Sequence, residues 1–556
     1  MLGASCTSAV LLLGLLAGVA CAADSFDVTM TVDAGKRIGP MKPLYRFFGA
    51  DEPNYAYMKD GRRLLADIGK LGPAPTYFRA HNLLTSGDGT PSLKWGSTNV
   101  YTEDANGHPV YDFTIVDRIF DAYLSNGVRP YVQLGFMPEA LSTHPEPYRH
   151  EWRPGLPYKL IMTGWCYPPK DYDKWRELCR KLTEHCVQKY GRAEVEKWYF
   201  ECWNEPNGDY WKGTPEEWYK LYDYAMDGVR RALPTARVGG PHTAGPGGGF
   251  ARDFYRHCLH GKNFATGQTG SPLDFVSFHA KGSPAFVDGH VRMGISAQLK
   301  AISNGFALIR EFPELKDTPI VIGESDPDGC AACQGPQLGY RSGTMYSSYT
   351  IASFAREYEL AEQHGVNLEG AVTWAFEFED QPYFAGQRTL ATNGIPLPVF
   401  NAFRLLATVR GDLVATTSTS AATLDAMVAK GVRGAPDVGC LAATDAGTLY
   451  VLAWHYHDDD IPGPDAHVTL NLAGLARGAY TVAESRVDAT HGNALTTWKD
   501  AGSPVAPDLK LYSAMQNASA NLDAGPARDL TIANGPASWT LNLPRQAVSL
   551  LVIRPK

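Results

Sequence analysis

The sequence predicts an α/β fold, a closed (β/α)8 or TIM barrel, followed by a C-terminal antiparallel β-sandwich domain. Eight short apolar runs alternate with helix-like stretches between about residues 44 and 380. Strands that alternate with helices form a parallel sheet, and eight such units close into a barrel. After about residue 410 the pattern changes to period-2 alternation broken by Gly and Pro turns, which is typical of a sandwich. A chain of 556 residues is also too long for a single hydrophobic core.

The eight apolar runs are the predicted barrel strands. In chain order they read LYRFFGADEPN, PTYFRAHNLL, RPYVQLGFMP, KWYFECWNEPN, ARVGGPHTA, DFVSFHAKG, TPIVIGESDPDG and GAVTWAFEFED. Helices are predicted between them, for example over 112–127 and over 172–191, where Gly191 stands as a C-cap residue. A doubly wound sheet is the alternative, but the count of eight and the lack of a Gly-rich phosphate loop after the first strand disfavour it.

The chain is predicted to contain four segments. Residues 1–22 form a signal peptide, and residues 23–43 form an N-terminal segment whose alternating FDVTMTVDAG stretch is a candidate strand of the sandwich. Residues 44–408 form the barrel, and residues 409–556 form the sandwich, which we interpret as a stabilising accessory domain.

The first 22 residues have the features of a secretory leader. Residues 10–20 form an apolar run too short to span a bilayer, and Ala20-Cys21-Ala22 resembles a cleavage site between small residues. The expected location is therefore the periplasm or the medium. The leader lacks Lys and Arg, and lipid anchoring at Cys21 is the alternative, although Gly18 stands where a lipobox prefers Leu. No later run has the ~18 apolar residues that a membrane-spanning helix needs.

Charge and cysteine pattern restrict the expected partners and cofactors. The net charge of −8 disfavours nucleic acid and anionic membranes as partners. Outside the leader eight cysteines remain, and only Cys330 and Cys333 form a close pair. A zinc site would need a second pair or histidines at ligand spacing, and neither is found. A local disulfide at this pair and buried thiols elsewhere are the expectation, with no metal or organic cofactor and no assigned oligomeric state.

Polar side chains stand at the C-terminal ends of the predicted barrel strands. In this fold those ends meet at the mouth of the barrel, where active sites lie. Burying carboxylates and imidazoles there costs free energy unless they are paired or used. A ring of such residues therefore predicts a catalytic site, and its members are His81, Asn204, Glu205, His242, His279, Lys281, Glu324 and Glu377.

Glu205 and Glu324 are the predicted catalytic pair. They end the fourth and seventh strands, which lie on roughly opposite sides of an eight-stranded ring. Cleavage of a glycosidic bond needs two carboxyl groups across a pocket, one to protonate the departing oxygen and one to trap the oxocarbenium-like carbon. The charge on one raises the pKa of the other, so that one stays protonated. The alternative for Glu205 is a cap or a surface ion pair, and for Glu324 a helix cap.

Seven segments along the chain form a recognisable set. They are YFRAHNLL, PYVQLGFMPEAL, ECWNEPN, DFVSFHAKG, TPIVIGESDPDG, AGQRTLATNGIPLPVFNAFRLL and, in the sandwich, ESRVDATHGNALTTWKDAGSP. Together they resemble glycoside hydrolase family 39, which contains β-xylosidases and α-L-iduronidases. The resemblance implies a retaining glycosidase with a small saccharide or oligosaccharide substrate and no cofactor. It implies that Glu205 is the general acid/base and Glu324 the nucleophile, with carboxyl groups about 5–5.5 Å apart.

The same resemblance assigns contacts with the sugar. Asn204 would hydrogen-bond the 2-hydroxyl, a contact that strengthens in the transition state. His81 and His279 would hold the nucleophile or sugar hydroxyls, with a structural histidine as the alternative for each. A structural role is the favoured interpretation of His242. Trp374 would form an aromatic floor for the sugar or pack in the core.

Lys281, Arg388 and Glu377 complete the predicted substrate-binding set. Lys281 and the Arg388 of AGQRTL resemble the iduronidase branch, in which such cations bind the substrate carboxylate. Lys281 could instead pair with Glu377 or Asp326, and xylose has no carboxylate. The exported architecture resembles β-xylosidases, so hydrolysis of terminal β-D-xylosyl residues is the expected activity, with α-L-iduronide or another pentoside as the alternative. A catalytically dead carbohydrate-binding protein is disfavoured because both carboxylates are present.

The segment after the seventh strand, residues 326–343, is expected to overhang the mouth. A Cys330–Cys333 bridge would stiffen it. A pocket shaped in this way admits chain ends, so exo action is predicted, with an open cleft for internal cleavage as the alternative.

Overall fold

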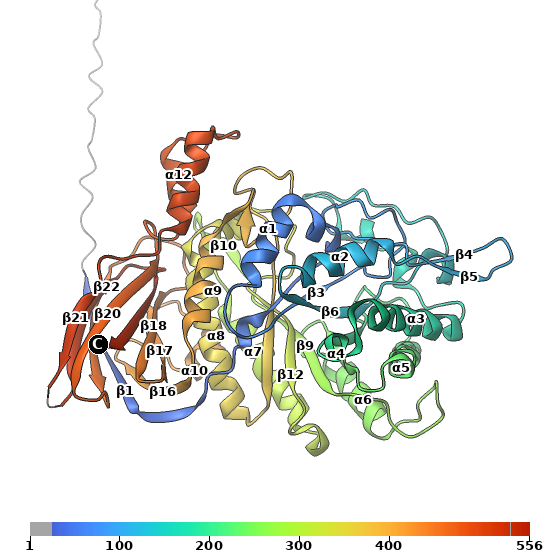
Figure 1. The fold of residues 1–556 in the computed structure, drawn as a ribbon, viewed down its shortest axis with the longest axis horizontal. Coiled ribbons are helices and arrows are strands. Elements are labelled where there is room, and N and C mark those ends of the chain that lie inside the picture. Colours follow the sequence, from blue (N-terminus) through green and yellow to red (C-terminus); the bar gives the residue numbers. More distant parts are fainter. Residues whose placement is uncertain (1–24, 534) are drawn as a thin grey trace, which may run out of the picture.

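The computed structural model describes residues 25–533 and 535–556, so the predicted leader and Cys21 lie outside the described residues. A barrel and a β-sheet domain lie side by side, with helices α8 and α9 between them (Figure 1). No helix in the described part of the chain is both long and apolar enough to cross a membrane.

Eight parallel strands close the barrel in chain order, which confirms the predicted fold. Each strand overlaps one of the eight predicted apolar runs. The strands are β2 (Phe47–Ala50), β3 (Thr76–Ala80), β6 (Val128–Leu134), β7 (Tyr199–Cys202), β8 (Arg237–Thr243), β9 (Phe275–Lys281), β12 (Ile320–Asp326) and β13 (Leu368–Trp374).

Large aromatic side chains from the first residues of the strands fill the lower part of the barrel. The Phe47 and Tyr77 rings stack at 5.1 Å, and Tyr131 and Tyr199 stack at 5.0 Å. With Phe275 they form one buried cluster. This packed interior is a floor rather than a pore, so a ligand can enter only from the C-terminal ends of the strands.

Helices cover the outside of the barrel. The predicted helix 172–191 is α3, and Gly191 caps it with φ 84°. Helix α8 is buried over most of its surface because it packs against both the barrel and the sandwich. The helices are α1 (Lys59–Ile68), α2 (Thr114–Leu124), α3 (Tyr172–Tyr190), α4 (Arg192–Val195), α5 (Pro215–Ala232), α6 (Gly248–His260), α7 (Ile295–Arg310), α8 (Thr344–His364) and α9 (Pro398–Thr408).

Nine strands form the second domain, which confirms the predicted sandwich. Their order is β21-β20-β23-β18-β17-β16-β1-β19-β22, and apolar side chains from both ends of this order share one core. The sheet therefore folds over on itself, with β21 and β22 as its edges. The bounds are β1 (Phe26–Pro40), β16 (Asp412–Ser418), β17 (Asp437–Asp445), β18 (Thr448–Tyr456), β19 (Ala466–Ala473), β20 (Gly478–Val487), β21 (Arg528–Ile532), β22 (Ala537–Leu543) and β23 (Val548–Pro555).

Strand β1 is an inner strand of this sheet, between β16 and β19, although it precedes the barrel in the chain. It pairs antiparallel with β16 and parallel with β19, and the latter is the one parallel ladder found in the described sheet. Besides seven short 3-10 helices, the described residues also form three short hairpins and three α-helices: β4 (Tyr101–Glu103) with β5 (Pro109–Tyr111), β10 (Ala285–Val287) with β11 (His290–Arg292), β14 (Ala391–Thr392) with β15 (Ile395–Pro396), α10 (Leu424–Lys430), α11 (Ala494–Asp500) and α12 (Leu509–Ala520).

Several contacts join the domains, among them the two described next. Arg356 of α8 pairs with Asp437 of β17 at 3.0 Å, and both side chains are buried. The insertion that contains α11 and α12 reaches back from the sandwich to the loop after β13. There the Tyr512 hydroxyl donates a hydrogen bond to the Asn393 carbonyl at 3.0 Å. The sandwich thus supports a loop at the mouth of the barrel.

Candidate active site

Glu205 and Glu324 face each other across the barrel mouth, as predicted from the strand ends. Between them lies His279 of β9, whose Nδ1 is 2.9 Å from Glu205 Oε1 and 3.7 Å from Glu324 Oε1. The two Oε1 atoms can therefore be no farther apart than the sum of those distances. This limit lies at the bottom of the ~6.5–9.5 Å range of inverting pairs and admits the ~5–5.5 Å of retaining pairs.

The two carboxyl groups differ in their exposure to solvent. The side chain of Glu205 is 25% exposed, whereas that of Glu324 is 6% exposed. Glu205 is thus open on the side where a leaving group and water must pass. Glu324 is enclosed, and its ionised form must be stabilised by other protein groups.

Cationic and imidazole groups stabilise the ionised form of Glu324. Lys281 Nζ lies 2.7 Å from Glu324 Oε2, and Arg79 Nη1 lies 3.1 Å from Glu324 Oε1. Burial raises the pKa of Glu324, but Lys281, His279, Arg79 and then His81 lower it, and the result is a pKa well below the usual range. Glu324 is therefore an anion at any pH near neutrality, as a nucleophile must be.

Arg79 is the main residue of the site that sequence reasoning missed. It is fully buried in β3 and contacts three groups with one guanidinium. Its Nε lies 2.6 Å from Glu201 Oε1, and its Nη2 donates to Asn204 Oδ1 at 2.8 Å. The third contact is Glu324. Because Asn204 Oδ1 accepts from Arg79, the amide Nδ2 of Asn204 remains as a donor for a sugar hydroxyl. The signal that could have identified Arg79 is its position as a cation inside an apolar strand run.

The backbone around Asn204 adopts a conformation that side chains rarely take. Trp203 has φ 70° and Glu205 has φ 44°, both in the left-handed region. Each such residue costs ~1–3 kcal/mol and persists only where the surroundings hold it. Here Trp203 is fully buried and its Nε1 donates to the Tyr210 carbonyl at 2.9 Å. The strained turn brings the amide of Asn204 and the carboxyl of Glu205 to the same site.

A second group of charges lies on the strand β2 side of the mouth. His81 Nδ1 lies 2.8 Å from Asp51 Oδ1, and Lys94 forms an ion pair with the same carboxylate. Burial lowers the pKa of His81, so this imidazole is neutral, and its Nε2 lies 3.6 Å from Glu324 Oε1. Asp51 and Lys94 were not predicted, because Lys94 lies in a loop with no motif around it.

Trp374 is a packed wall of the site and presents little free surface. It is 2% exposed, its Nε1 donates to Asp51 Oδ1 at 3.2 Å, and its ring lies 4.4 Å from that of His81. The Arg79 guanidinium lies 4.9 Å above the same ring. Of the two predicted roles, the contacts favour packing.

Lys281 and Arg388 are both occupied by protein carboxylates. Lys281 Nζ contacts Asp326 Oδ2 at 2.5 Å as well as Glu324, which is one of the pairings considered from sequence. Arg388 is fully buried, and its Nη1 lies 2.7 Å from Asp328 Oδ1. Its guanidinium is thus paired with buried carboxylates, and substrate binding by Arg388 stays a prediction that these contacts do not favour.

Glu377 and His242 are both buried without a cationic partner in the described residues. Glu377 is 1% exposed, and its Oε1 accepts a hydrogen bond from the Gly394 amide at 2.6 Å. Burial raises the pKa of Glu377 to about 8, so it is a neutral acid, and it forms no ion pair with Lys281. Burial lowers the pKa of His242 to about 3, and its Nε2 lies against Glu201. Both are structural groups around the site rather than contacts with its open side.

The loop after β12 is tied down as the sequence predicted. Cys330 and Cys333 form a disulfide. Beside it the buried Arg341 donates hydrogen bonds to the carbonyls of both cysteines at 2.6 Å and pairs with Asp328 at 2.7 Å. The six other cysteines of the described residues are buried free thiols, also as expected.

Comparison with known proteins identifies the relatives of this chain. A family model described as "Glycosyl hydrolases family 39" matches residues 28–528. The chain is 26% identical over 464 residues to a β-xylosidase of Geobacillus stearothermophilus, with 80% of this chain and 79% of that protein covered. It is also 26% identical over 529 residues to the α-L-iduronidase of Mus musculus, with 87% and 74% covered. Its fold is similar to that of a monomeric β-xylosidase from Caulobacter crescentus CB15, with TM-score 0.73, 22% identity and coverage of 95% and 99%.

Proposed function

The chain belongs to glycosyl hydrolases family 39 and is a glycosidase, and we propose that it is a retaining exo-β-xylosidase that releases terminal β-D-xylosyl residues. The observation that carries this proposal is the single imidazole of His279 lying between an exposed Glu205 and an enclosed, anionic Glu324. One carboxyl group can therefore exchange protons with the leaving group while the other attacks.

The proposed reaction has two displacements. In the first, a carboxylate oxygen of Glu324 attacks the anomeric carbon, the glycosidic C–O bond breaks, and Glu205 gives its proton to the departing oxygen. In the second, Glu205 takes a proton from water, the hydroxide attacks the anomeric carbon, and the ester to Glu324 breaks. The Asn204 amide donates to the 2-hydroxyl in both steps, with its position fixed by Arg79.

The charge balance of the site supports a neutral sugar. Lys281 and Arg388 are the cations expected to bind an iduronate carboxylate, and each already contacts carboxylates of the protein. A further carboxylate beside Glu324 and Asp326 would meet their negative charge at short range. Xylose carries no carboxylate, so it avoids that repulsion. The relatives do not decide the question, because a β-xylosidase and an α-L-iduronidase match with the same identity.

Azide rescue tests the roles of the two carboxyl groups. We expect Glu205→Ala to lower the turnover of an aryl β-xyloside by ~10²–10⁴-fold, the usual contribution of general acid/base catalysis. Azide should then restore turnover and give the β-xylosyl azide. With Glu324→Ala azide should give the α-xylosyl azide, because it replaces the nucleophile directly. If both variants keep wild-type turnover, the assignment fails.

A side-by-side assay tests the sugar. Aryl β-D-xylopyranoside and aryl α-L-iduronide are offered to the wild-type enzyme at one pH, and kcat/KM is compared. We expect the xyloside to be hydrolysed at least tenfold more efficiently. A preference for the iduronide would reject the xylosidase proposal and leave the glycosidase mechanism intact.

Exo action and export complete the proposal. Xylo-oligosaccharides should yield xylose from one end, and a mixture of short internal products would reject exo cleavage. Export is supported by the Cys330–Cys333 disulfide, since such bonds persist in oxidising compartments. N-terminal sequencing of the protein from the periplasm or medium should find cleavage near Ala22, whereas retention of the leader on a cytosolic protein would contradict export.

A further inference from the structure

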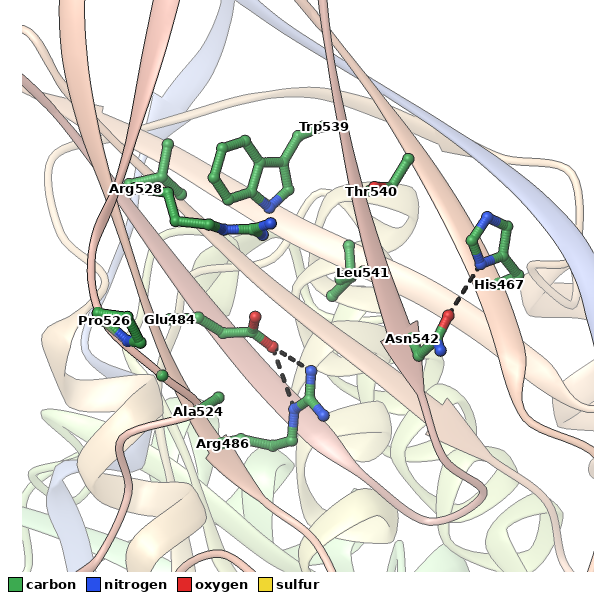
Figure 2. Close-up of a pocket in the computed structure, with 12 residues that line it drawn as sticks. His467, Glu484, Arg486, Ala524, Pro526, Arg528, Trp539, Thr540, Leu541 and Asn542 are labelled. Carbon is green, nitrogen blue, oxygen red and sulfur yellow. Dashed lines mark hydrogen bonds and ion pairs between the residues drawn. The ribbon is translucent and has the colours of Figure 1, made fainter.

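A cavity of about 490 Å³ lies in the sandwich domain, between strands of the two edges of the folded sheet (Figure 2). Strands β21 and β22 are those edges, and they do not pair with each other although only residues 533–536 separate them. The volume falls in the ~300–1,000 Å³ range of small-ligand sites. The lining residues are His467, Val482, Glu484, Arg486, Ala524, Gly525, Pro526, Arg528, Trp539, Thr540, Leu541 and Asn542.

The floor of this cavity is apolar and aromatic. Val482, Trp539 and Leu541 are buried side chains that also belong to the core of the sandwich. Trp539 Nε1 is buried and has no hydrogen-bond partner among the residues described. Buried indole N–H groups usually have a partner. An aromatic ring with an unused donor is thus present beside polar groups.

The rim of the cavity carries a positive charge that no protein carboxylate neutralises. Arg528 is exposed, makes no ion pair with the described residues, and rests over the Trp539 ring at 4.1 Å. Arg486 is different, because its Nε lies 3.1 Å from Glu484 Oε1 and that pair is nearly neutral. Figure 2 shows Arg528 directed into the ring of lining residues, apart from the Glu484–Arg486 pair. An unneutralised cation is notable in a chain of net charge −8.

Hydrogen-bonding groups of β19 and β22 also line the cavity. His467 Nδ1 lies 2.8 Å from Asn542 Oδ1, which leaves the Asn542 amide Nδ2 as a donor. The Thr540 hydroxyl lies on the same edge strand and is exposed. The cavity therefore combines an aromatic floor, a forked cation and neutral polar groups, the combination that suits a sugar bearing an acid group.

We propose that this cavity binds a pyranose sugar that carries a carboxylate, as a hexuronic acid unit does. The Arg528 guanidinium binds the carboxylate through two parallel hydrogen bonds, and the sugar ring lies against Trp539. Asn542 and Thr540 contact the hydroxyls. The arginine has only its contact with the tryptophan to give up, because it holds no carboxylate of the protein.

Charge selects this ligand over the alternatives. A neutral sugar would leave Arg528 without a partner, and a peptide strand added to β22 would not require Arg528 at all. A carboxylate gives Arg528 the ion-pair partner that it lacks among the described residues. The cavity does not involve Glu205 or Glu324, so the proposal can fail or succeed independently of the proposed function.

Two matched ligands test the proposal directly. Methyl β-D-glucuronoside and methyl β-D-xyloside differ only in the carboxylate at C5. Binding of each to the full chain carrying Glu324→Ala, which prevents turnover, is measured by calorimetry and by saturation-transfer NMR. Because the xyloside can also enter the barrel site, the quantity compared is the binding that Arg528→Ala removes. We expect this component to be at least tenfold tighter for the glucuronoside, with an affinity that falls as salt is added. Equal binding of the two glycosides would overturn the proposal.

Arginine variants locate the binding. Arg528→Ala should weaken glucuronoside binding at least tenfold, and Arg528→Lys should recover only part of it, because lysine lacks the fork. The matched control is Arg477→Ala, which removes another exposed positive charge from the same domain and should change nothing. Wild-type affinity in Arg528→Ala, with or without a lower melting temperature, would assign the arginine a structural role and reject the site.

A further experiment with polymers shows whether the acid sugar is a branch on a polysaccharide or a free uronic acid. Migration of the full chain through gels containing glucuronoxylan is compared with gels containing a neutral xylan. Retention that Arg528→Ala abolishes and free glucuronoside relieves identifies an acidic branch on a polymer. Binding of the free sugar without retention identifies a free uronic acid. If the chain is not retained by the polymer and does not bind the free sugar, the proposal is rejected. In the otherwise wild-type enzyme, Arg528→Ala should leave aryl xyloside turnover within twofold. A larger loss of turnover would mean that Arg528 affects the catalytic site, which contradicts an independent cavity.

Discussion

Replacing Lys281 with methionine removes one positive charge from the enclosed side of the site and keeps a side chain of similar length. In the wild type Lys281 Nζ lies 2.7 Å from Glu324 Oε2 and 2.5 Å from Asp326 Oδ2. Burial raises the pKa of Glu324, and Lys281 is the largest of the opposing charges that lower it. The substitution should therefore raise the pKa of Glu324.

The size of the shift follows from the distance. An opposite charge within ~4–6 Å lowers the pKa of a carboxyl group by about 1–3 units, and each unit corresponds to ~1.4 kcal/mol. Glu324 must be ionised to attack, so the rate falls as the pH drops through its pKa. Because Lys281→Met raises that pKa, the acidic limb of kcat/KM should begin at a pH about 1–3 units higher.

The assay is the pH dependence of kcat/KM for an aryl β-xyloside, which reports ionisations of the free enzyme. Lys281→Arg is the matched control, since it keeps the charge and should keep most of the limb in place. Thermal melting checks the fold, because Asp326 loses one partner but retains its hydrogen bond from the Trp374 amide at 2.9 Å. An unmoved limb with a rate lowered equally at every pH would refute this reasoning and make Lys281 a binding residue only.

Three further substitutions test buried groups away from the nucleophile. Glu377→Gln should raise the free energy of unfolding at pH 7 by about 1–3 kcal/mol. Burial raises the pKa of Glu377 from 4.5 to about 8, so the wild type loses stability as pH rises between those values. Chemical denaturation should show that this gain vanishes near pH 4, and a gain that persists there would contradict the titration of Glu377. Arg356→Met should cost about 3–5 kcal/mol, because it leaves Asp437 buried and unpaired between the domains; loss of less than ~1 kcal/mol would mean that the pair is solvated. Replacing Cys330 and Cys333 with serine should lower the free energy of unfolding by about 2 kcal/mol, as expected for a short closed loop, and an unchanged denaturation midpoint would show that the other loop contacts suffice.

The barrel strands could be predicted because each is a short apolar run. The length of such a run fits a strand, and its continuous apolar pattern is not typical of a loop. The convergence of the proposed catalytic pair at one site could be predicted for a related reason. Glu205 and Glu324 interrupt the apolar pattern at the strand ends, where topology brings the ends together. No contact had to be known in advance, since ring closure alone places the fourth and seventh strands opposite each other.

The groups that tune the site could not be read in this way. Arg79 was not recognised because one cation in an apolar strand gives no sign of which carboxylates it will meet, and its three contacts come from other strands or strand ends. Lys94 lies in an irregular loop, and only the fold shows that it reaches Asp51. The ion pair of Arg388 could not be read from the sequence for the same reason, because a motif places a cation near the mouth but does not show that Asp328 already binds it.

The different surroundings of the two carboxyl groups explain why their roles cannot be exchanged. Glu324 is 6% exposed and has Lys281 and Arg79 as direct partners, which hold its pKa well below the usual range. Glu205 is 25% exposed, and its Oε1 lies 2.9 Å from the imidazole of His279. The proposed mechanism therefore depends on an uneven distribution of positive charge around the two acids as well as on their presence. Arg79 contributes to this asymmetry, because its Nη1 contacts Glu324 while its Nη2 holds Asn204 in place.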